Sequence, residues 1–210
     1  MNIAITIFEF VVLIFSAVLH EVAHGYTAQY LGDNTAEQAG RLTLNPIKHL
    51  DFFGSFLMPV LLYLASGGAF FFAAAKPVPY NPNNLKNPRS GGAIIALAGP
   101  LTNFTLAIIF GVAVRLLSYT PVSDLFLSLL ALICYVNILL GVFNLVPIPP
   151  LDGSRVLFAV LPQTPGTFKA AYFLERWGLL FVLIFVFFGF QLIVPIMTNL
   201  FTLLTGQPFL

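Results

Sequence analysis

Long apolar stretches alternate with short polar connectors along this chain. A helix that crosses a bilayer takes about 20 mainly apolar residues. Four stretches meet this requirement, namely residues 3–31, 93–117, 125–146 and 179–200. A fifth, residues 52–75, contains Pro59 and Ser66-Gly67-Gly68, which interrupt regular helix, so we expect a broken or re-entrant path for it. The pattern predicts an all-α polytopic membrane protein with about four spanning helices.

Composition strengthens the membrane assignment. Of the 210 residues, 59% are hydrophobic and 8% are charged, whereas soluble domains carry about 25% charged residues. The polar surface is therefore too small to coat a water-facing globule, and the lipid bilayer is the expected surrounding. A net charge of +1 without a basic tract argues against nucleic acid as a partner.

The apolar N-terminal stretch and the absence of linkers bear on domain organisation. Residues before His20 have no positive start and no small-residue cleavage site, so we expect a retained helix and not a signal peptide. No internal repeat or linker divides the chain, which predicts one membrane domain over residues 1–210. Nothing in the pattern indicates an oligomeric state.

Basic residues gather in three polar connectors, residues 32–51, 76–89 and 147–176. Lysine and arginine are enriched on the cytoplasmic side of membrane proteins. All three connectors are therefore expected on that side, in a prokaryotic cytoplasmic membrane, with the site described next opening to the cytoplasm.

The strongest chemical signal is His20-Glu21-Val22-Ala23-His24. Residues four apart share one helix face, so both imidazoles can reach one tetrahedral Zn²⁺ while Glu21 lies beside them. Ionisable residues in an apolar span are costly, by at least about 2.5 kcal/mol each, and usually mark function. The alternative is that these residues merely form the wet end of the first helix.

A third ligand has to come from elsewhere in the chain. The soluble metzincin continuation is excluded, because Thr27 and Tyr30 stand where it needs Gly and His. The candidates for this ligand are Glu37, His49, Asp51, Asp124 and Asp152. Asp152 stands out because prolines at 147, 149 and 150 forbid regular helix and could return the chain towards the metal. An Asp-Gly pair after prolines is equally an ordinary turn.

Three motifs in order resemble the site-2 protease family of intramembrane zinc metalloproteases. They are His20 to His24, Gly99-Pro100-Leu101-Thr102-Asn103, and Asn144 followed by Pro147 and Asp152-Gly153. Residues 40–51 and Lys76-Pro77-Val78-Pro79 are similar to the small prokaryotic members that lack a PDZ domain. Phe52 and Ala75 depart from the family pattern and bear on loop shape more than on catalysis.

The resemblance implies a role for each of these residues. His20, His24 and Asp152 would ligate Zn²⁺, and Glu21 would be the general base. Asn103 would line the substrate groove, although hydrogen bonding between helices is an equal alternative for Asn103 and for Asn144. The implied substrate is a membrane protein with a transmembrane segment.

The path of the chain constrains this arrangement. Asp152 can meet the histidines only if the segment 52–75 makes no net crossing, turning back near Ser66-Gly67-Gly68 or returning as extended chain through residues 76–80. We also expect short extended strands at residues 41–45 or 76–80, which could pair with an unwound substrate.

Two other functions compete with proteolysis. One is a zinc-binding membrane protein without peptidase activity. The other is an ion-coupled or proton-coupled transporter whose intramembrane His, Glu and Asp relay charge. The ligand spacing and the lack of repeated halves weigh against a transporter.

Overall fold

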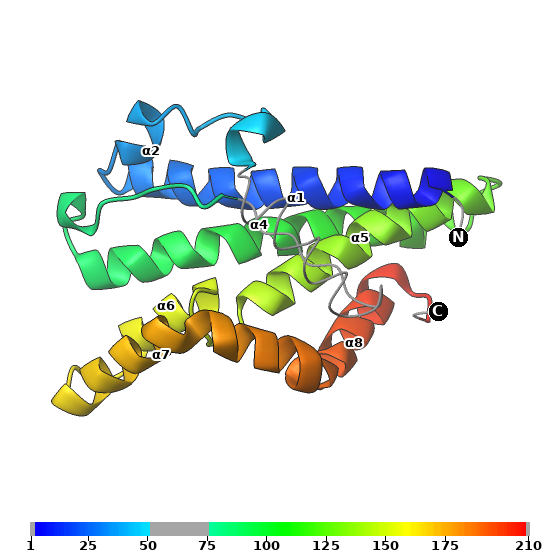
Figure 1. The fold of residues 1–210 in the computed structure, drawn as a ribbon. Coiled ribbons are helices and arrows are strands. Elements are labelled where there is room, and N and C mark those ends of the chain that lie inside the picture. Colours follow the sequence, from blue (N-terminus) through cyan, green and yellow to red (C-terminus); the bar gives the residue numbers. More distant parts are fainter. Residues whose placement is uncertain (1–2, 51–75, 209–210) are drawn as a thin grey trace.

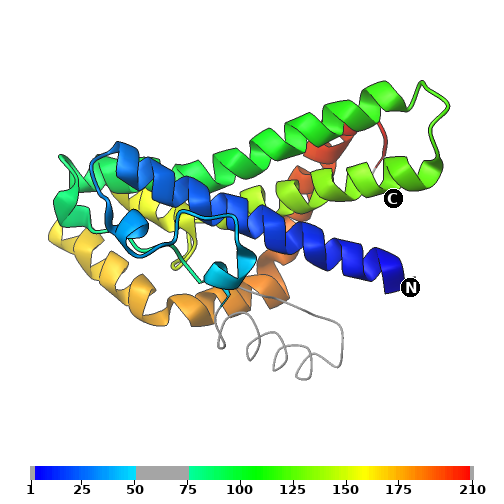
Figure 2. The ribbon, with the colours of Figure 1, turned by 90° about the horizontal axis from the view of Figure 1, so that it is seen from above.

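Three long helices lie side by side (Figures 1 and 2). Their buried polar side chains include His20, Asn103 and Asn137. The computed structural model describes residues 3–50 and 76–208. Within them the long helices are α1 (Ile3–Tyr30), α4 (Pro88–Leu117) and α5 (Asp124–Asn144). Cys134 packs at the α4–α5 contact, in the main apolar core, as its apolar surroundings predict.

The remaining helices are shorter or bent. α2 (Thr35–Gln38) and two 3₁₀ turns, η1 (Pro46–His49) and η3 (Pro82–Asn84), lie in the connectors. α6 (Asp152–Val160) precedes α7 (Pro165–Ile184), which continues through the π-turn η4 (Phe185–Gly189) and the 3₁₀ turn η5 (Phe190–Leu192) to α8 (Val194–Thr205). The helix α7 with its two turns forms the fourth segment long and apolar enough to span a membrane.

Neighbouring long helices run antiparallel. The carbonyl of Ile95, near the start of α4, accepts a hydrogen bond from His24, near the end of α1. A Cβ on Gly111, late in α4, would contact Cys134, in the middle of α5. The chain therefore leaves α1 and enters α4 at the same end of the bundle, which is also where α5 ends. The predicted path of residues 52–75 itself lies outside the described residues.

The fourth span was predicted too late in the chain. The helix begins at Pro165 and not near residue 179, because Thr164 accepts a hydrogen bond from the Thr167 amide and Pro165 suits the first helical position. The span ends at Leu192, shortly before α8 begins at Val194 with Pro195 in its first turn. Charged side chains at 169, 175 and 176 are exposed on this helix. They interrupt the apolar pattern, so the first turns of the helix were not included in the predicted span.

The predicted strands are not formed in the described part of the chain, where residues 41–45 are irregular with a bend at 42–43 and residues 76–81 form no ladder. Pro77 and Pro79 have no N–H to donate. The Val78 amide donates to Glu21 and the Lys76 amide donates to the His49 carbonyl. Residues 76–79 thus have no free donor left for a regular strand pairing.

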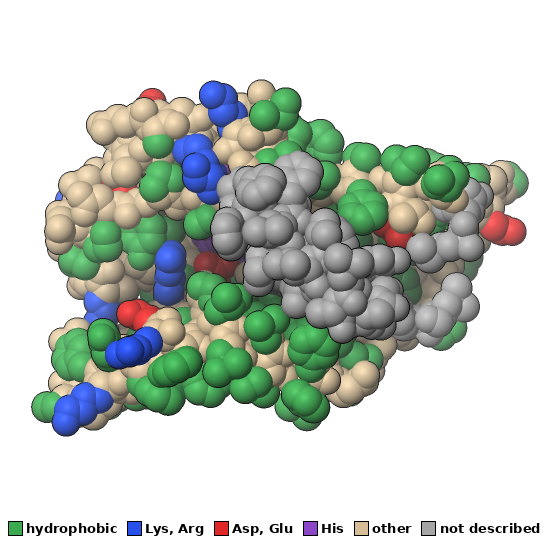
Figure 3. Space-filling view, in the orientation of Figure 1, with side chains coloured by type: hydrophobic (Ala, Val, Ile, Leu, Met, Phe, Trp, Pro, Cys, Tyr) green, Lys and Arg blue, Asp and Glu red, His purple; other side chains and the backbone are tan. Residues whose placement is uncertain are grey.

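The surface of the bundle suits a bilayer. Large apolar side chains are exposed along α1, α4, α7 and α8, and they cover much of the face in Figure 3. Of the nine basic residues, all except Arg115 lie in or beside the three connectors. In Figure 3 blue side chains gather at the end of the molecule where α1 ends and α4 begins. The apolar surface and the four apolar helices make this an integral membrane protein.

Asp33 ties two connectors together just beyond α1. Its buried carboxylate accepts hydrogen bonds from the amide and hydroxyl of Thr35, from the Asn81 amide and from the Asn84 side chain. Burial raises the pKa of Asp33, but these hydrogen bonds outweigh burial, and the pKa lies below its ordinary value of 3.8. The ionised form therefore holds residues 81–84 against the end of α1.

The Asp33→Asn variant should lower the thermal unfolding midpoint in detergent, since each buried donor left without an acceptor costs about 1–3 kcal/mol. A lowered pKa stabilises the fold above the unfolded pKa, so this difference from wild type should shrink below about pH 4. Glu37→Gln, which changes an exposed carboxylate bonded to Gln29, is the control. Equal midpoints for the two variants at neutral pH would contradict the anchoring role.

Candidate metal centre

Two histidines and one aspartate converge inside the bundle. His20 and His24 lie one turn apart on α1, and Asp152 is the first residue of α6. The Nε2 atoms of His20 and His24 lie 3.0 and 3.2 Å from the same carboxylate oxygen of Asp152, Oδ2. All three side chains are buried. Within the described residues, theirs is the one group of His, Cys, Asp and Glu side chains close enough to share a metal ion.

Hydrogen bonds fix the tautomer of His20. The Asn137 side-chain amide donates to the Ile133 carbonyl, so the Asn137 oxygen is left to accept from Asn103 at 2.9 Å. The Asn103 oxygen in turn faces Nδ1 of His20 at 2.6 Å. Since that oxygen can only accept, Nδ1 must carry a proton, and in the neutral imidazole Nε2 then presents a lone pair towards Asp152.

A single backbone contact fixes the tautomer of His24. Its Nδ1 lies 2.6 Å from the carbonyl oxygen of Ile95, which can only accept a hydrogen bond. In the neutral imidazole Nε2 of His24 is then unprotonated as well, which is the form that binds a metal. Such contacts from the second nitrogen of an imidazole orient a metal-binding histidine and strengthen it as a ligand.

The donor set fits a divalent metal. Two imidazole lone pairs and a carboxylate oxygen face one another, and three acceptors in one buried place repel unless a cation lies between them. Bond lengths of about 2.0–2.1 Å in a tetrahedral zinc site imply neighbouring ligand atoms about 3.3 Å apart. The separations of 3.0 and 3.2 Å are close to that value. Two histidines and one carboxylate are also the ligands of a known class of catalytic zinc sites.

Gly99 makes room for the two imidazoles. A Cβ at this position of α4 would lie 2.5 Å from Nε2 of His20 and 2.5 Å from Nε2 of His24. These are the two atoms that face Asp152, so any side chain at 99 would occupy the metal position. The metal site therefore requires glycine at position 99 because it needs the space that a side chain would fill, and not because the helix needs flexibility there.

A tight turn delivers Asp152 to the histidines. The Leu151 amide bonds to the Ile148 carbonyl, and the amide and hydroxyl of Ser154 both bond to the Leu151 carbonyl. A Cβ on Gly153 would lie 2.1 Å from the carbonyl oxygen of Leu145, so only glycine allows the turn to close against the end of α5. The prolyl stretch therefore both turns the chain and presents a carboxylate.

Glu21 lies next to this cluster but is not one of its three ligands. Its Oε2 accepts a hydrogen bond of 2.8 Å from the Val78 amide, and its side chain is partly exposed. Within residues 3–50 and 76–208 its other carboxylate oxygen accepts no hydrogen bond. Residues 76–81 consequently hold the predicted base in a defined position beside the histidines.

Asn103 is fully enclosed and bridges His20 to Asn137. Of the two roles left open by the sequence, these contacts favour hydrogen bonding between helices, and substrate contact stays a prediction. Asn144 donates only to the Leu140 carbonyl of its own helix among the described residues. The sequence analysis missed Asn137 and Ser16, whose side chains hydrogen-bond each other at 3.0 Å in the buried interior. An amide in the middle of an apolar helix was the signal for Asn137.

Of the other residues considered as third ligand, those that the structure describes do not join the histidine pair. Glu37 is exposed and bonds to Gln29, and Asp124 begins α5 at the opposite end of the bundle. His49 is buried in η1 and contacts the Thr43 carbonyl at 2.8 Å. Asp51 lies outside the described residues.

Replacing Gly99 with alanine should abolish metal binding, because its methyl group would enter the space between the two imidazole nitrogens. Alanine is the better helix former by about 1 kcal/mol, so α4 itself should persist. Metal content of the purified protein measures the loss. Gly92→Ala in the same helix, whose Cβ would meet only the Tyr80 hydroxyl at 3.5 Å, should keep its metal. Full metal content in Gly99→Ala would disprove the assignment of the site.

Replacing Asn137 with leucine tests the hydrogen-bond relay. The variant leaves the Asn103 amide only its long 3.5 Å contact with the Ser16 carbonyl. Asn103 and His20 are then held less firmly, so zinc affinity should fall about 10- to 100-fold. Competition with a chromophoric chelator measures the affinity, and circular dichroism checks the helices. Ser128→Ala, which removes a hydroxyl bonded only to the backbone of α5, is the matched control. An affinity equal to that of the control would show that the relay does not position His20.

Comparison with known proteins matches the peptidase family M50 model over residues 8–125 and 118–185. YwhC of Bacillus subtilis, whose name assigns it to the zinc metalloproteases, is 38% identical over 187 residues, covering 84% of this chain and 78% of YwhC. Rip2 of Mycolicibacterium smegmatis is 35% identical over 169 residues, covering 80% and 62%. MJ0392 of Methanocaldococcus jannaschii, named a zinc metalloprotease, is 28% identical over 183 residues, covering 86% and 42%.

The chain thus spans most of YwhC but less than two thirds of Rip2 and of MJ0392. No solved structure gives a significant match. The family match extends through all three helices that surround the cluster and through Asp152. The buried histidine pair, the returning aspartate and this match together lead to one conclusion: the chain belongs to peptidase family M50, the site-2 protease family.

Proposed function

We propose that His20, His24 and Asp152 hold a catalytic Zn²⁺ and that Glu21 is the general base of peptide-bond hydrolysis. The observation that carries the proposal is the convergence of two imidazole lone pairs and one carboxylate oxygen in a buried place. Family membership makes this protein an intramembrane zinc metallopeptidase. The names of YwhC, Rip2 and MJ0392 agree with zinc as the metal.

The site lies below the end of α1, inside the expected membrane span. His24 and His20 precede the last residue of the helix, Tyr30, by six and ten positions. At 1.5 Å per residue this puts them about 9 and 15 Å from the helix end. Because the apolar core of a bilayer is about 30 Å thick, the site lies beneath the lipid surface.

Each residue of the site has its own role in hydrolysis. Bound zinc would polarise the scissile carbonyl and make water a stronger acid near pH 7. Glu21 accepts the proton of the attacking water and passes it to the departing amine nitrogen. Val78 holds one Glu21 oxygen through its amide, which leaves the other oxygen for the proton. Asn103 and Ile95 keep the two imidazoles aimed at the metal.

The substrate class is a transmembrane or membrane-proximal segment of another protein. Its helix must unwind locally, because helical amides are engaged with one another and shielded from attack. Pairing of the unwound segment with residues 76–79 has little support, since their amides are already used or absent. Residues 41–45 stay the better candidate for such pairing.

The active site opens towards the cytoplasm in this proposal. The end of the bundle nearest the cluster carries the three connectors and all basic residues except Arg115. The positive-inside tendency assigns that end to the cytoplasm. A prokaryotic cytoplasmic membrane fits this orientation.

The Glu21→Gln variant separates metal binding from catalysis. The glutamine oxygen still accepts from the Val78 amide, so fold and zinc content should be retained. Cleavage of a model transmembrane substrate should fall about 10²- to 10⁴-fold, the usual contribution of general acid–base catalysis. Gel analysis in lipid nanodiscs measures cleavage, and Glu9→Gln in the same helix is the control. Undiminished cleavage with full zinc would exclude Glu21 as the base, and a wild type that binds zinc without cleaving would favour the non-proteolytic alternative.

A further inference from the structure

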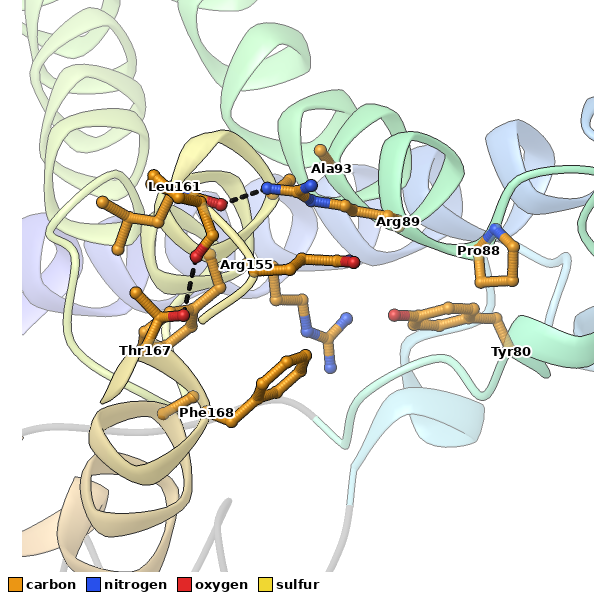
Figure 4. A pocket seen from close by; sticks show the side chains of 14 residues that line it. Tyr80, Pro88, Arg89, Ala93, Arg155, Leu161, Thr167 and Phe168 are labelled. Carbon is orange, nitrogen blue, oxygen red and sulfur yellow. Dashed lines mark hydrogen bonds between the residues drawn. The ribbon is translucent and has the colours of Figure 1, made fainter. Parts of the chain in front are cut away.

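A second hollow lies beside the metal centre, at the connector end of the bundle. It has a volume of about 280 Å³ and is lined by residues 80, 88, 89, 92, 93, 155, 158, 159, 161–163, 167, 168 and 171 (Figure 4). Its walls come from the extended segment after residue 76, the start of α4, the helix α6 and the start of α7. None of the three proposed zinc ligands lines it, so it is a separate site.

The charge of this pocket is positive. Arg89 and Arg155 line it, and no carboxylate does. Arg155 is exposed, and its guanidinium lies over the Tyr80 ring, 5.2 Å from the centroid. Among the described residues no side-chain or backbone group accepts a hydrogen bond from Arg155 and none forms an ion pair with it. Its five N–H donors are thus available to an anion.

Arg89 contributes a second, partly engaged guanidinium. One of its terminal nitrogens donates to the Leu161 carbonyl, which fixes the side chain across the top of the pocket in Figure 4. No other acceptor in the described part of the chain engages the remaining N–H groups of Arg89. Thr167, whose hydroxyl bonds to the Pro162 carbonyl, orders the opposite wall. Two guanidinium groups with available N–H donors thus line one pocket, where they can attract and hydrogen-bond an anionic group.

The position of the pocket suits a ligand with one anionic part and one apolar part. It lies where α4 and α7 enter the apolar spans, and Phe168 on its rim is 61% exposed. Val160, Tyr172 and Phe173, on or beside the same elements, are also largely exposed. A molecule bound here would have its anionic group among arginines and its apolar part against aromatic rings. Ligand pockets usually measure about 300–1,000 Å³, so this one accommodates a headgroup and not a whole lipid.

We propose that this pocket binds the phosphate of an anionic phospholipid headgroup, with Arg89 and Arg155 as the anion ligands. Basic pockets between helices on the cytoplasmic side are a known mode of lipid recognition. The acyl chains would run along the exposed face of α7 past Phe168. The proposal does not depend on peptidase activity.

Lipid binding to the purified full chain tests the proposal. Native mass spectrometry in detergent would titrate phosphatidylglycerol against phosphatidylcholine for wild type, Arg89→Gln, Arg155→Gln and the control Arg176→Gln, which removes a charge from α7 outside the pocket. Wild type should prefer phosphatidylglycerol. Each pocket variant should weaken its affinity about fivefold, and Arg176→Gln should leave it within about twofold. Thermal unfolding in phosphatidylcholine alone checks that each variant is folded.

Several outcomes would overturn the proposal. Equal affinities in the pocket variants and the Arg176 control would make the binding nonspecific. Displacement of the lipid by millimolar inorganic phosphate would assign the pocket to a soluble anion. Loss of cleavage of a substrate with acidic flanking residues in purely phosphatidylcholine nanodiscs, for Arg155→Gln but not for Arg176→Gln, would assign it to substrate. If Arg155→Gln does not fold, Arg89→Gln and the charge-preserving Arg155→Lys carry the comparison.

Discussion

Three electron-pair donors pointed at one another in an apolar interior are unstable without a cation, and this constraint organises the molecule. The arrangement persists because each imidazole is held from behind, one by an amide relay and the other by a backbone carbonyl. The glycine at 99 and the turn before Asp152 keep the space between them open. Much of what is unusual in the three long helices follows from this one requirement.

Sequence reasoning reached the site unevenly. The four-residue spacing of His20 and His24 is local, so helical periodicity alone placed them on one face. Asp152 is 132 residues away from His20, and its residue pattern was equally consistent with an ordinary turn. Only resemblance to a family distinguished it, because no local rule encodes a contact that depends on how three helices pack.

The limits of local sequence patterns also explain where the observed fold differs from the predicted one. The count of four spans followed from apolar length, which the bilayer dictates directly. The start of α7 was missed because its first turns carry exposed charges while its N-cap signal, Thr164-Pro165, was overlooked. Strands at residues 76–80 were expected from extended, proline-rich chain, but strand pairing needs free amides, and these are spent on Glu21 and His49.

The amide relay has a wider thermodynamic meaning. It runs from the Ile133 carbonyl of α5 through Asn103 of α4 to His20 of α1, so the three helices and the coordination sphere share one set of hydrogen bonds. Metal binding and helix association are then reciprocally linked. With zinc bound at the proposed site, its removal by a chelator would weaken the packing of the three helices, and separation of α1 from α4 would weaken zinc binding.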